Sequence, residues 1–213
     1  MASILPFHSP PSPHTIEQAV ACIQAGGVLV VPTDSFYAFA VGAFQPAVLE
    51  QLLAIKGDRE HKPFPVLIGD PSQLDQLVDH VPEIATKLMQ QFWPGLLTVV
   101  LKAKPHVSPV LMSESGTIGV RQPNHSLLCN LLMHTGPLTG TSANRTGQAP
   151  AMTVENVQHQ LGADIDLILD GGPTPGGQPS TVLQVEPELR LLRQGKIPLS
   201  AIQNVLGNGI LTG

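Results

Sequence analysis

A cluster of small polar residues follows an apolar, β-branched run near the N-terminus of the chain. Residues 26–42 read GGVLVVPTDSFYAFAVG, so a glycine pair precedes the run and Pro32 ends it. This pattern predicts a buried strand that delivers Thr33, Asp34 and Ser35 to its end. Ligands of open α/β sheets bind beyond strand ends, which makes these hydroxyls and this carboxylate candidates for substrate contact. An ordinary turn is the alternative interpretation, because short polar residues after proline are common in turns.

Basic side chains lie beside junctions of the chain that contain glycine, proline or serine. They are Lys56, Arg59, Lys62, Arg121, Arg145 and Arg193. Acidic residues are concentrated instead in the segments with helical periodicity. This distribution predicts a cationic cleft inside an acidic shell, which would bind an anionic substrate. The alternative is a set of solvated surface charges with no common site.

The composition is that of a globular protein. A length of 213 residues fits one large domain. We expect the proline-rich residues 1–14 to form an extended segment that leads into this domain. An apolar content of 42% with 13% charged residues excludes a disordered chain. The apolar runs are too short for a membrane span, and residues 1–15 do not resemble a secretory signal. Cys22 and Cys129 have no CxxC spacing, so we expect buried free thiols in a reducing cytoplasm.

Helical periodicity alternates with short apolar runs along the chain. Helices are predicted near 15–25, 46–56, 72–78, 82–92, 127–132, 153–161 and 198–206, and strands near 28–32, 63–68, 96–101, 117–121, 167–169, 181–185 and 189–193. A capping box at Thr15 to Gln18 is expected to begin the first helix, and Thr153 to cap a later one. Strands alternating with helices predict an α/β fold with a mixed sheet, and the polar junctions after strands would meet in a cleft.

Seven short motifs occur in a consistent order over nearly the whole chain. They are PTDSFY (32–37), the basic loop ending in KPF (56–64), FWPG with Leu-Leu-Thr (92–98), VRQP (120–123), TSANRTG (141–147), PSTV (179–182) and LLRQG (191–195). In this order they resemble the YrdC-type domain of the threonylcarbamoyl-adenylate synthase family. The resemblance implies a twisted, open, mixed α/β sheet with flanking helices around a large concave, positively charged cleft. It also implies a nucleotidyltransferase that makes threonylcarbamoyl-adenylate and pyrophosphate from L-threonine, bicarbonate and ATP, for threonylcarbamoyladenosine in tRNA.

The resemblance also implies which residues bind the substrates. Thr33, Arg121 and Ser180 would bind threonine, with the Arg121 guanidinium suited to the substrate carboxylate. The residues that would surround ATP are Lys56, Arg59, Thr117, Ser142, Asn144 and Arg193. No activated nucleophile is needed, because catalysis would consist of positioning and of cationic stabilisation of phosphate oxygens. Mg²⁺ is expected with ATP, whose triphosphate would supply many of its ligands, because no dense carboxylate cluster indicates a metal site made by the protein.

Asp58 is the main departure from the family pattern, which usually has arginine two residues after the lysine that matches Lys56. We expect Arg59 to replace that arginine through a one-residue adjustment of a loop in which Gly57 permits unusual backbone angles. Smaller departures are Ala38, Leu96 and Thr146, where glycine, proline and serine are more usual.

Two other functions therefore stay open. One is an RNA-binding protein of the same fold, and the other is a diverged homologue with another nucleotide-linked small-molecule role. A net charge of -5 with 11 Lys and Arg residues predicts weak, mostly electrostatic binding of tRNA or other RNA. As an enzyme, the protein would pass its product to a downstream tRNA threonylcarbamoyl transferase, with no membrane partner. The sequence does not distinguish threonine from serine as the amino acid.

Overall fold

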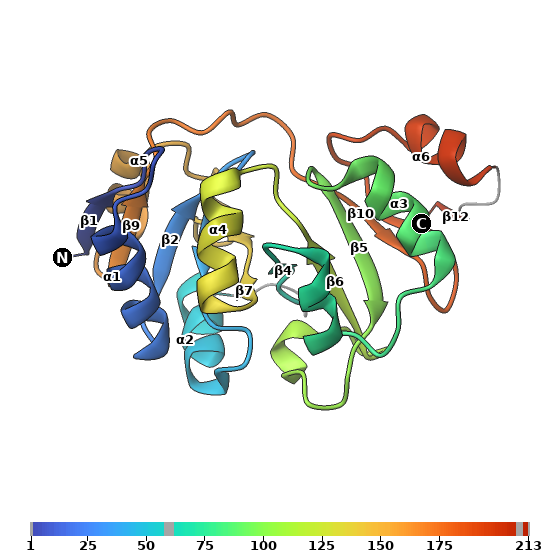
Figure 1. The fold of residues 1–213 in the computed structure, drawn as a ribbon, viewed down its shortest axis with the longest axis horizontal. Helices are drawn as coiled ribbons and strands as arrows, with labels where there is room; N and C mark the ends of the chain where they lie inside the picture. Colours follow the sequence, from blue (N-terminus) through green and yellow to red (C-terminus); the bar gives the residue numbers. More distant parts are fainter. Residues whose placement is uncertain (1, 58–61, 208–210, 213) are drawn as a thin grey trace.

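The computed structural model describes residues 2–57, 62–207 and 211–212 (Figure 1). Its helices are α1 (Pro13–Gln24), α2 (Pro46–Lys56), α3 (Glu83–Phe92), α4 (Ser126–Thr135), α5 (Val154–Leu161) and α6 (Leu199–Leu206), with 3-10 helices η1 (Pro71–Gln76) and η2 (Pro109–Leu111). Its strands are β1 (Ser3–Pro6), β2 (Leu29–Pro32), β3 (Tyr37–Ala40), β4 (Val66–Leu67), β5 (Leu97–Lys102), β6 (Thr117–Arg121), β7 (Leu138–Thr139), β8 (Thr141–Ser142), β9 (Leu167–Asp170), β10 (Thr181–Gln184), β11 (Arg190–Arg193) and β12 (Leu211–Thr212).

The strands of the described residues form two mixed sheets. The β2 sheet has the order β1-β9-β2-β3-β8, and the β5 sheet has the order β12-β11-β10-β5-β6-β4-β7. In the first, β2 pairs antiparallel with β3 and parallel with β9. In the second, β5 pairs antiparallel with β6 and parallel with β10. The predicted mixed α/β fold is confirmed, but the strands are divided between two sheets instead of lying in one.

Strand β2 is buried on both faces, which explains its continuous apolar sequence. Val28 and Val30 belong to a large apolar core that also contains Val99 of the β5 sheet, so this core continues from one sheet to the other. Leu29 and Val31 point to the opposite face, where they join a second core with residues of α1 and α4. The period-2 alternation of side chains thus places β2 between two packed layers.

Three details of the N-terminal half differ from the sequence-based expectation. Residues 37–40 form β3, a central strand that the sequence did not indicate, between β2 and β8. The lead-in contains β1, which pairs in parallel with β9. The capping box is wrong, because α1 begins at Pro13 and the Thr15 hydroxyl donates instead to the Pro6 carbonyl at 3.1 Å. The predicted Thr153 cap is confirmed, since its side chain accepts from the Asn156 N–H.

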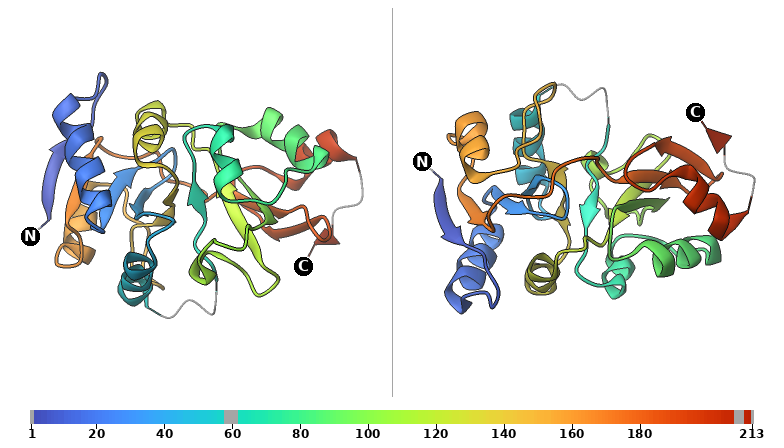
Figure 2. Two further views of the ribbon diagram at one scale, coloured as in Figure 1. Left: turned by 60° about the horizontal axis from the view of Figure 1, so that its bottom comes forward. Right: turned by 90° about the horizontal axis from the view of Figure 1, so that it is seen from above.

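Two segments of the chain cross between the β2 sheet and the β5 sheet. At Gly140 the chain passes from β7, which pairs with β4, to β8, which pairs with β3. A Cβ atom at Gly140 would collide with the Leu67 side chain, so only glycine fits this close crossing. The second crossing is the segment 171–180, which runs from β9 to β10 over the space between the sheets (Figures 1 and 2). Both crossings border the candidate site.

Candidate functional site

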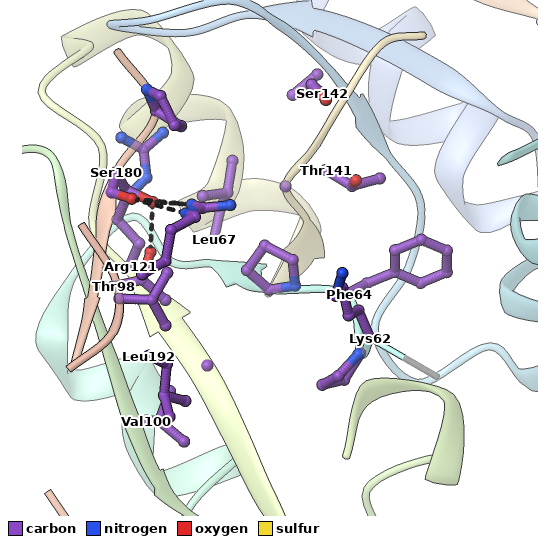
Figure 3. Close-up of a pocket in the computed structure, with 18 of the residues that line it drawn as sticks. Lys62, Phe64, Leu67, Thr98, Val100, Arg121, Thr141, Ser142, Ser180 and Leu192 are labelled. Atoms are coloured by element: carbon purple, nitrogen blue, oxygen red, sulfur yellow. Dashed lines mark hydrogen bonds between the residues drawn. The ribbon is translucent and has the colours of Figure 1, made fainter. Parts of the chain in front are cut away.

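A cleft of about 1100 Å³ lies between the two sheets and is lined by side chains from both of them (Figure 3). The β2 sheet and its turns contribute Thr33, Ser35 and Ser142, while β6 contributes Thr117 and Arg121. The cations that line the cleft in the described part of the chain are Lys56, Lys62, Arg121 and Arg193, and no described aspartate or glutamate lines it. The predicted cationic cleft is therefore confirmed.

The structure brings the described candidate residues into this one cleft. They are Thr33, Lys56, Thr117, Arg121, Ser142, Asn144, Ser180 and Arg193. Arg59 and Asp58 lie outside the described residues, so the exchange between them stays a prediction. Arg145 was wrongly expected near the cleft, because its guanidinium pairs with Asp164 at 2.6 Å and donates to the Ile55 carbonyl at 3.0 Å.

Arg121 ends β6 as a buried cation with a carboxylate partner. Its side chain is 6% exposed, and Nη1 donates to Asp34 Oδ1 at 3.0 Å and to the Gly95 carbonyl at 3.4 Å. Burial lowers the pKa of Arg121, and the Asp34 charge opposes that shift. Asp34 also accepts from the Asn124 N–H at 3.1 Å. The turn after β2 is thereby tied to the end of β6 in the other sheet.

Ser180 is held next to this arginine by Thr98 and Arg193. Arg193 donates from Nε and Nη2 to the Ser180 carbonyl at 3.2 and 2.9 Å, and from Nη2 to the Ser180 hydroxyl at 3.1 Å. The hydroxyls of Ser180 and Thr98 share a hydrogen bond of 2.8 Å, visible in Figure 3. Burial, and the nearby charge of Arg121, lower the pKa of Arg193. Two guanidinium groups and two hydroxyls thus make an anion-binding end of the cleft.

Lys56 lies at the C-terminus of α2 on the other wall of the cleft. Its Nζ donates to the carbonyls of Ser142 and Asn144 at 2.8 and 2.7 Å, and to Asn144 Oδ1 at 3.3 Å. The Ser142 hydroxyl donates to the same Asn144 oxygen at 2.6 Å. The ammonium group therefore fixes the turn that presents Ser142 and Asn144 to the cleft.

The floor of the cleft is one face of the β5 sheet. Thr117, Gly119 and Arg121 alternate along β6 and all line the cleft, with about 13 Å between the first and the last. A Cβ atom at Gly119 would lie 3.1 Å from the Thr98 methyl group, so glycine keeps the middle of this floor flat. At the far end, the Thr117 hydroxyl lies 2.7 Å from that of Ser113. The cleft thus has a cationic end, a flat middle and a hydroxyl-rich end.

The turn after β2 is braced by its own side chains and by the crossing segment. Thr33 Oγ1 donates to the Phe36 carbonyl at 2.7 Å and accepts from the Ser35 N–H at 3.1 Å. The Tyr37 hydroxyl donates to the Gly172 carbonyl at 2.8 Å, and the Gly176 N–H donates to the Ser35 carbonyl at 2.6 Å. Burial and the Asp170 charge raise the pKa of Tyr37 to about 12. The crossing segment is therefore anchored on the turn that carries Thr33.

Sequence reasoning missed two supporting side chains of this site. Thr98 was included only as the last residue of the motif at 92–98 and was given no role, although its hydroxyl bonds to that of Ser180. Asp34 was identified only as a possible substrate contact, whereas it pairs with Arg121 and does not line the cleft. A buried arginine requires a partner, so the aspartate of the PTDSFY motif was the available candidate for the partner of the arginine in the VRQP motif.

The described residues show no group of three or more His, Cys, Asp or Glu side chains that could hold a metal ion. Cys22 and Cys129 are both free and half-buried, so the expectation of free thiols is confirmed while their burial is only partial. No helix in the described ranges is long and apolar enough to cross a bilayer.

Comparisons with known proteins agree with this geometry. A family model for Sua5, YciO and YrdC, described as Telomere recombination, matches residues 21–195. A Mycobacterium leprae protein is 36% identical over 193 residues, which cover 90% of this chain and 88% of its relative. The Bacillus subtilis threonylcarbamoyl-AMP synthase is 36% identical over 195 residues, which cover 90% of this chain and 56% of that protein.

A solved structure extends the similarity to three dimensions. The crystal structure of Pyrococcus abyssi Sua5 complexed with L-threonine superposes with a TM-score of 0.92 at 30% identity. The match covers 99% of this chain and 62% of that one. The chain thus spans less than two thirds of the length of the Bacillus and Pyrococcus relatives.

Proposed function

The chain belongs to the Sua5, YciO and YrdC family, and from this premise we propose that it is a threonylcarbamoyl-AMP synthase. One observation supports this most strongly. Thr33, Arg121 and Ser180 line the same cleft as Ser142 and Thr117. An amino acid and a nucleotide could therefore bind side by side, as a transfer between them requires.

The proposed reaction has two steps that use no protein nucleophile. The amine of L-threonine attacks bicarbonate and, with loss of water, forms a carbamate. A carboxylate oxygen of this carbamate then attacks the α-phosphorus of ATP. The bond from the α-phosphorus to the bridging oxygen breaks, and pyrophosphate leaves with the electron pair. The protein's task is to hold both substrates in line and to stabilise the negative charge on the phosphate oxygens.

The described side chains suit these tasks by charge and position. Arg121 binds the threonine carboxylate, because its guanidinium can form a bidentate pair with it. Thr33 and Ser180 donate or accept at the polar groups of the amino acid, and Arg193, beside Ser180, faces the phosphates. Ser142 is presented to the nucleotide by the turn that Lys56 fixes. Each of these groups acts by position and charge and forms no covalent bond.

Mg²⁺ fits this site as a companion of ATP, with ligands from the triphosphate and water. The described residues offer hydroxyls and cations there but no carboxylate group that could make a metal cage. Mg²⁺ would neutralise part of the phosphate charge. Lys62 and Arg193 line the same cleft and would share that task.

The remaining parts of the proposal follow from the chemistry of the product. A mixed anhydride with AMP is an activated acyl donor, so a tRNA threonylcarbamoyl transferase must consume it. Bicarbonate as the carbon source and tRNA as the final acceptor belong to this proposal. A cytoplasmic reaction suits both ATP and tRNA.

The test is pyrophosphate release by this chain itself, since it is shorter than several of its relatives. The full mixture should release pyrophosphate, and omission of ATP, bicarbonate or threonine should each abolish the release. Replacement of threonine by serine tests the choice of amino acid. Well-folded protein that releases no pyrophosphate above background in the full mixture would exclude the synthase.

A further inference from the structure

We propose that Asp34 is a positioning residue for Arg121 and thereby sets the affinity of the cleft for the carboxylate of the amino acid. The inference rests on the proposed function. Asp34 does not line the cleft, so a bound substrate would not touch it. Its effect on catalysis would pass entirely through the guanidinium group of Arg121.

Both carboxylate oxygens of Asp34 are used to hold the far wall of the site. Oδ1 accepts from Arg121 Nη1 at 3.0 Å, and Oδ2 accepts from the Asn124 N–H at 3.1 Å. Asp34 belongs to the turn between β2 and β3, whereas Arg121 and Asn124 lie at the end of β6 and just after it. The Asn124 N–H thus holds in place the carboxylate that accepts from Arg121 Nη1.

This arrangement decides which donors of Arg121 remain for a ligand. Nη1 is occupied by Asp34 and by the Gly95 carbonyl. Nε and Nη2 make no hydrogen bond to any residue in the described part of the chain, although Arg121 lines the cleft. The edge of the guanidinium that carries Nε and Nη2 can therefore receive both oxygens of a substrate carboxylate.

Asp34 also balances charge at this end of the cleft. Arg193 lies near enough to Arg121 for the charge of one to lower the pKa of the other. The two guanidinium groups repel each other. The Asp34 carboxylate pairs with Arg121 and offsets part of this positive charge. Without Asp34 the cleft gains positive charge but loses the fixed orientation of Arg121. These two effects on threonine affinity have opposite signs, so an experiment can separate them.

The first variant is Asp34→Asn, measured by the kinetics of pyrophosphate release. An amide has an NH2 group in place of one carboxylate oxygen, so a donor would face the N–H of either Arg121 or Asn124 and one of the two hydrogen bonds would be lost. We expect the KM for threonine to rise about 10-fold, the scale of one charge-assisted hydrogen bond, while the KM for ATP stays within about twofold. An unchanged or lower KM for threonine would overturn the positioning role, since it would mean that net charge governs the site.

Asp166→Asn is the matched control. Asp166 also accepts from a backbone N–H, that of Val28 at 2.8 Å, but it lies outside the cleft. Its replacement should leave the KM for threonine unchanged even if the protein becomes less stable. A rise in this KM equal to that of Asp34→Asn would assign both effects to general destabilisation and would overturn the inference.

A second variant, Asp34→Glu, keeps the charge and covers the case in which Asp34→Asn does not fold. The additional methylene group displaces the guanidinium, so positioning predicts a raised KM for threonine in this variant too. Full wild-type affinity would show that charge alone matters and would overturn the inference.

The coupling of the two residues gives the sharpest test. In an Arg121→Ala background, Asp34→Asn should cause no further rise in the KM for threonine, because the residue through which Asp34 acts is absent. A second, independent rise of about 10-fold would overturn the proposal. The wild-type protein separates the two levels of inference. If it lacks threonine-dependent activity, the proposed function fails, whereas an active wild type with a normal Asp34→Asn variant rejects this inference alone.

Discussion

Lys56 and Arg121 are both buried cations in one cleft, but their donors are used in opposite ways. Each residue is 5% exposed. Lys56 donates to three oxygen atoms of Ser142 and Asn144, so its ammonium group holds a turn of the protein. Arg121 uses Nη1 for Asp34 and Gly95, and its remaining donors have no partner among the described residues. Burial alone therefore does not identify a substrate-binding cation, whereas the use of its donors does.

This difference gives Lys56 a structural role in its wall of the cleft. A direct contact of Lys56 with ATP stays a prediction, but its hydrogen bonds already explain why the chain needs a lysine there. The turn that it holds presents Ser142 and Asn144 to the cleft. We therefore expect substitutions of Lys56 to lower mainly the stability of the fold, and substitutions of Arg121 to lower mainly the use of threonine as substrate.

The largest expected effect is that of Lys56→Met. It leaves buried carbonyl oxygens without donors and should lower the free energy of unfolding by about 3 kcal/mol, the upper range for hydrogen bonds to a charged group. Urea denaturation measures it. Lys87→Met is the control, because Lys87 pairs with Glu83 on an exposed helix face, and we expect little change in stability. A small loss of stability together with loss of ATP use would instead indicate direct contact with ATP.

Arg121→Ala should give the next largest effect, on activity. We expect kcat/KM for threonine to fall by a factor that corresponds to about 2 kcal/mol of transition-state stabilisation, the scale of a charge-assisted hydrogen bond. The KM for ATP should change little. Steady-state pyrophosphate release at varied threonine measures this loss. Arg190→Ala provides a control, since Arg190 pairs with Glu188 and does not line the cleft. Unchanged threonine dependence in Arg121→Ala would show that the carboxylate is bound elsewhere.

Thr98→Val tests the support of Ser180 with a smaller change. The substitution keeps the shape of the side chain and removes the hydroxyl that lies 2.8 Å from the Ser180 hydroxyl. We expect kcat/KM for threonine to fall by a factor that corresponds to about 1 kcal/mol of transition-state stabilisation, the typical net value of one hydrogen bond. Thr139→Val is the matched control, because its buried hydroxyl bonds to the Phe39 carbonyl and lies outside the cleft. Equal losses of activity in both variants would contradict a specific role for Thr98.

Tyr37→Phe tests a contribution to stability that changes only at high pH. The hydroxyl of Tyr37 donates to Gly172, and its pKa of about 12 in the folded protein exceeds the ordinary value of about 10. Because this pKa is raised in the folded state, the contribution of the hydroxyl to the free energy of unfolding is fully present below a pH of about 10. It is lost as the pH rises toward 12. Urea denaturation between these pH values should show a steeper loss of stability in the wild type than in Tyr37→Phe. Parallel curves would contradict this assignment.

The local elements of the fold could largely be predicted from the sequence. The helix that begins at Pro46 and ends at Lys56, the strand from 117 to 121 and the Thr153 cap depend on nearby residues, and the structure confirms them. The same is true of the hairpin of β10 and β11. Each of these predictions uses periodicity, proline and glycine signals, or a cap, all within one segment.

The pairings between distant segments could not be predicted in this way. β3 was missed because its residues 37–40 are all buried and become a strand only between β2 and β8. The division into two sheets likewise depends on contacts that no local pattern encodes. Arg145 was misplaced because its partner, Asp164, follows 19 residues later. The described candidate residues, chosen by their motifs, all line one cleft, whereas the pair of Asp34 and Arg121 joins residues 87 positions apart.

The central claim is that this cleft joins threonine, bicarbonate and ATP into one product. Mass spectrometry of a reaction with isotopically labelled bicarbonate tests it most directly, because the label reports where the carbon of the carbamoyl group originates. We predict threonylcarbamoyl-AMP that carries the label, formed by the wild type and strongly reduced in Arg121→Ala. An adenylate without the label, or no adenylate from well-folded wild-type protein, would contradict the account.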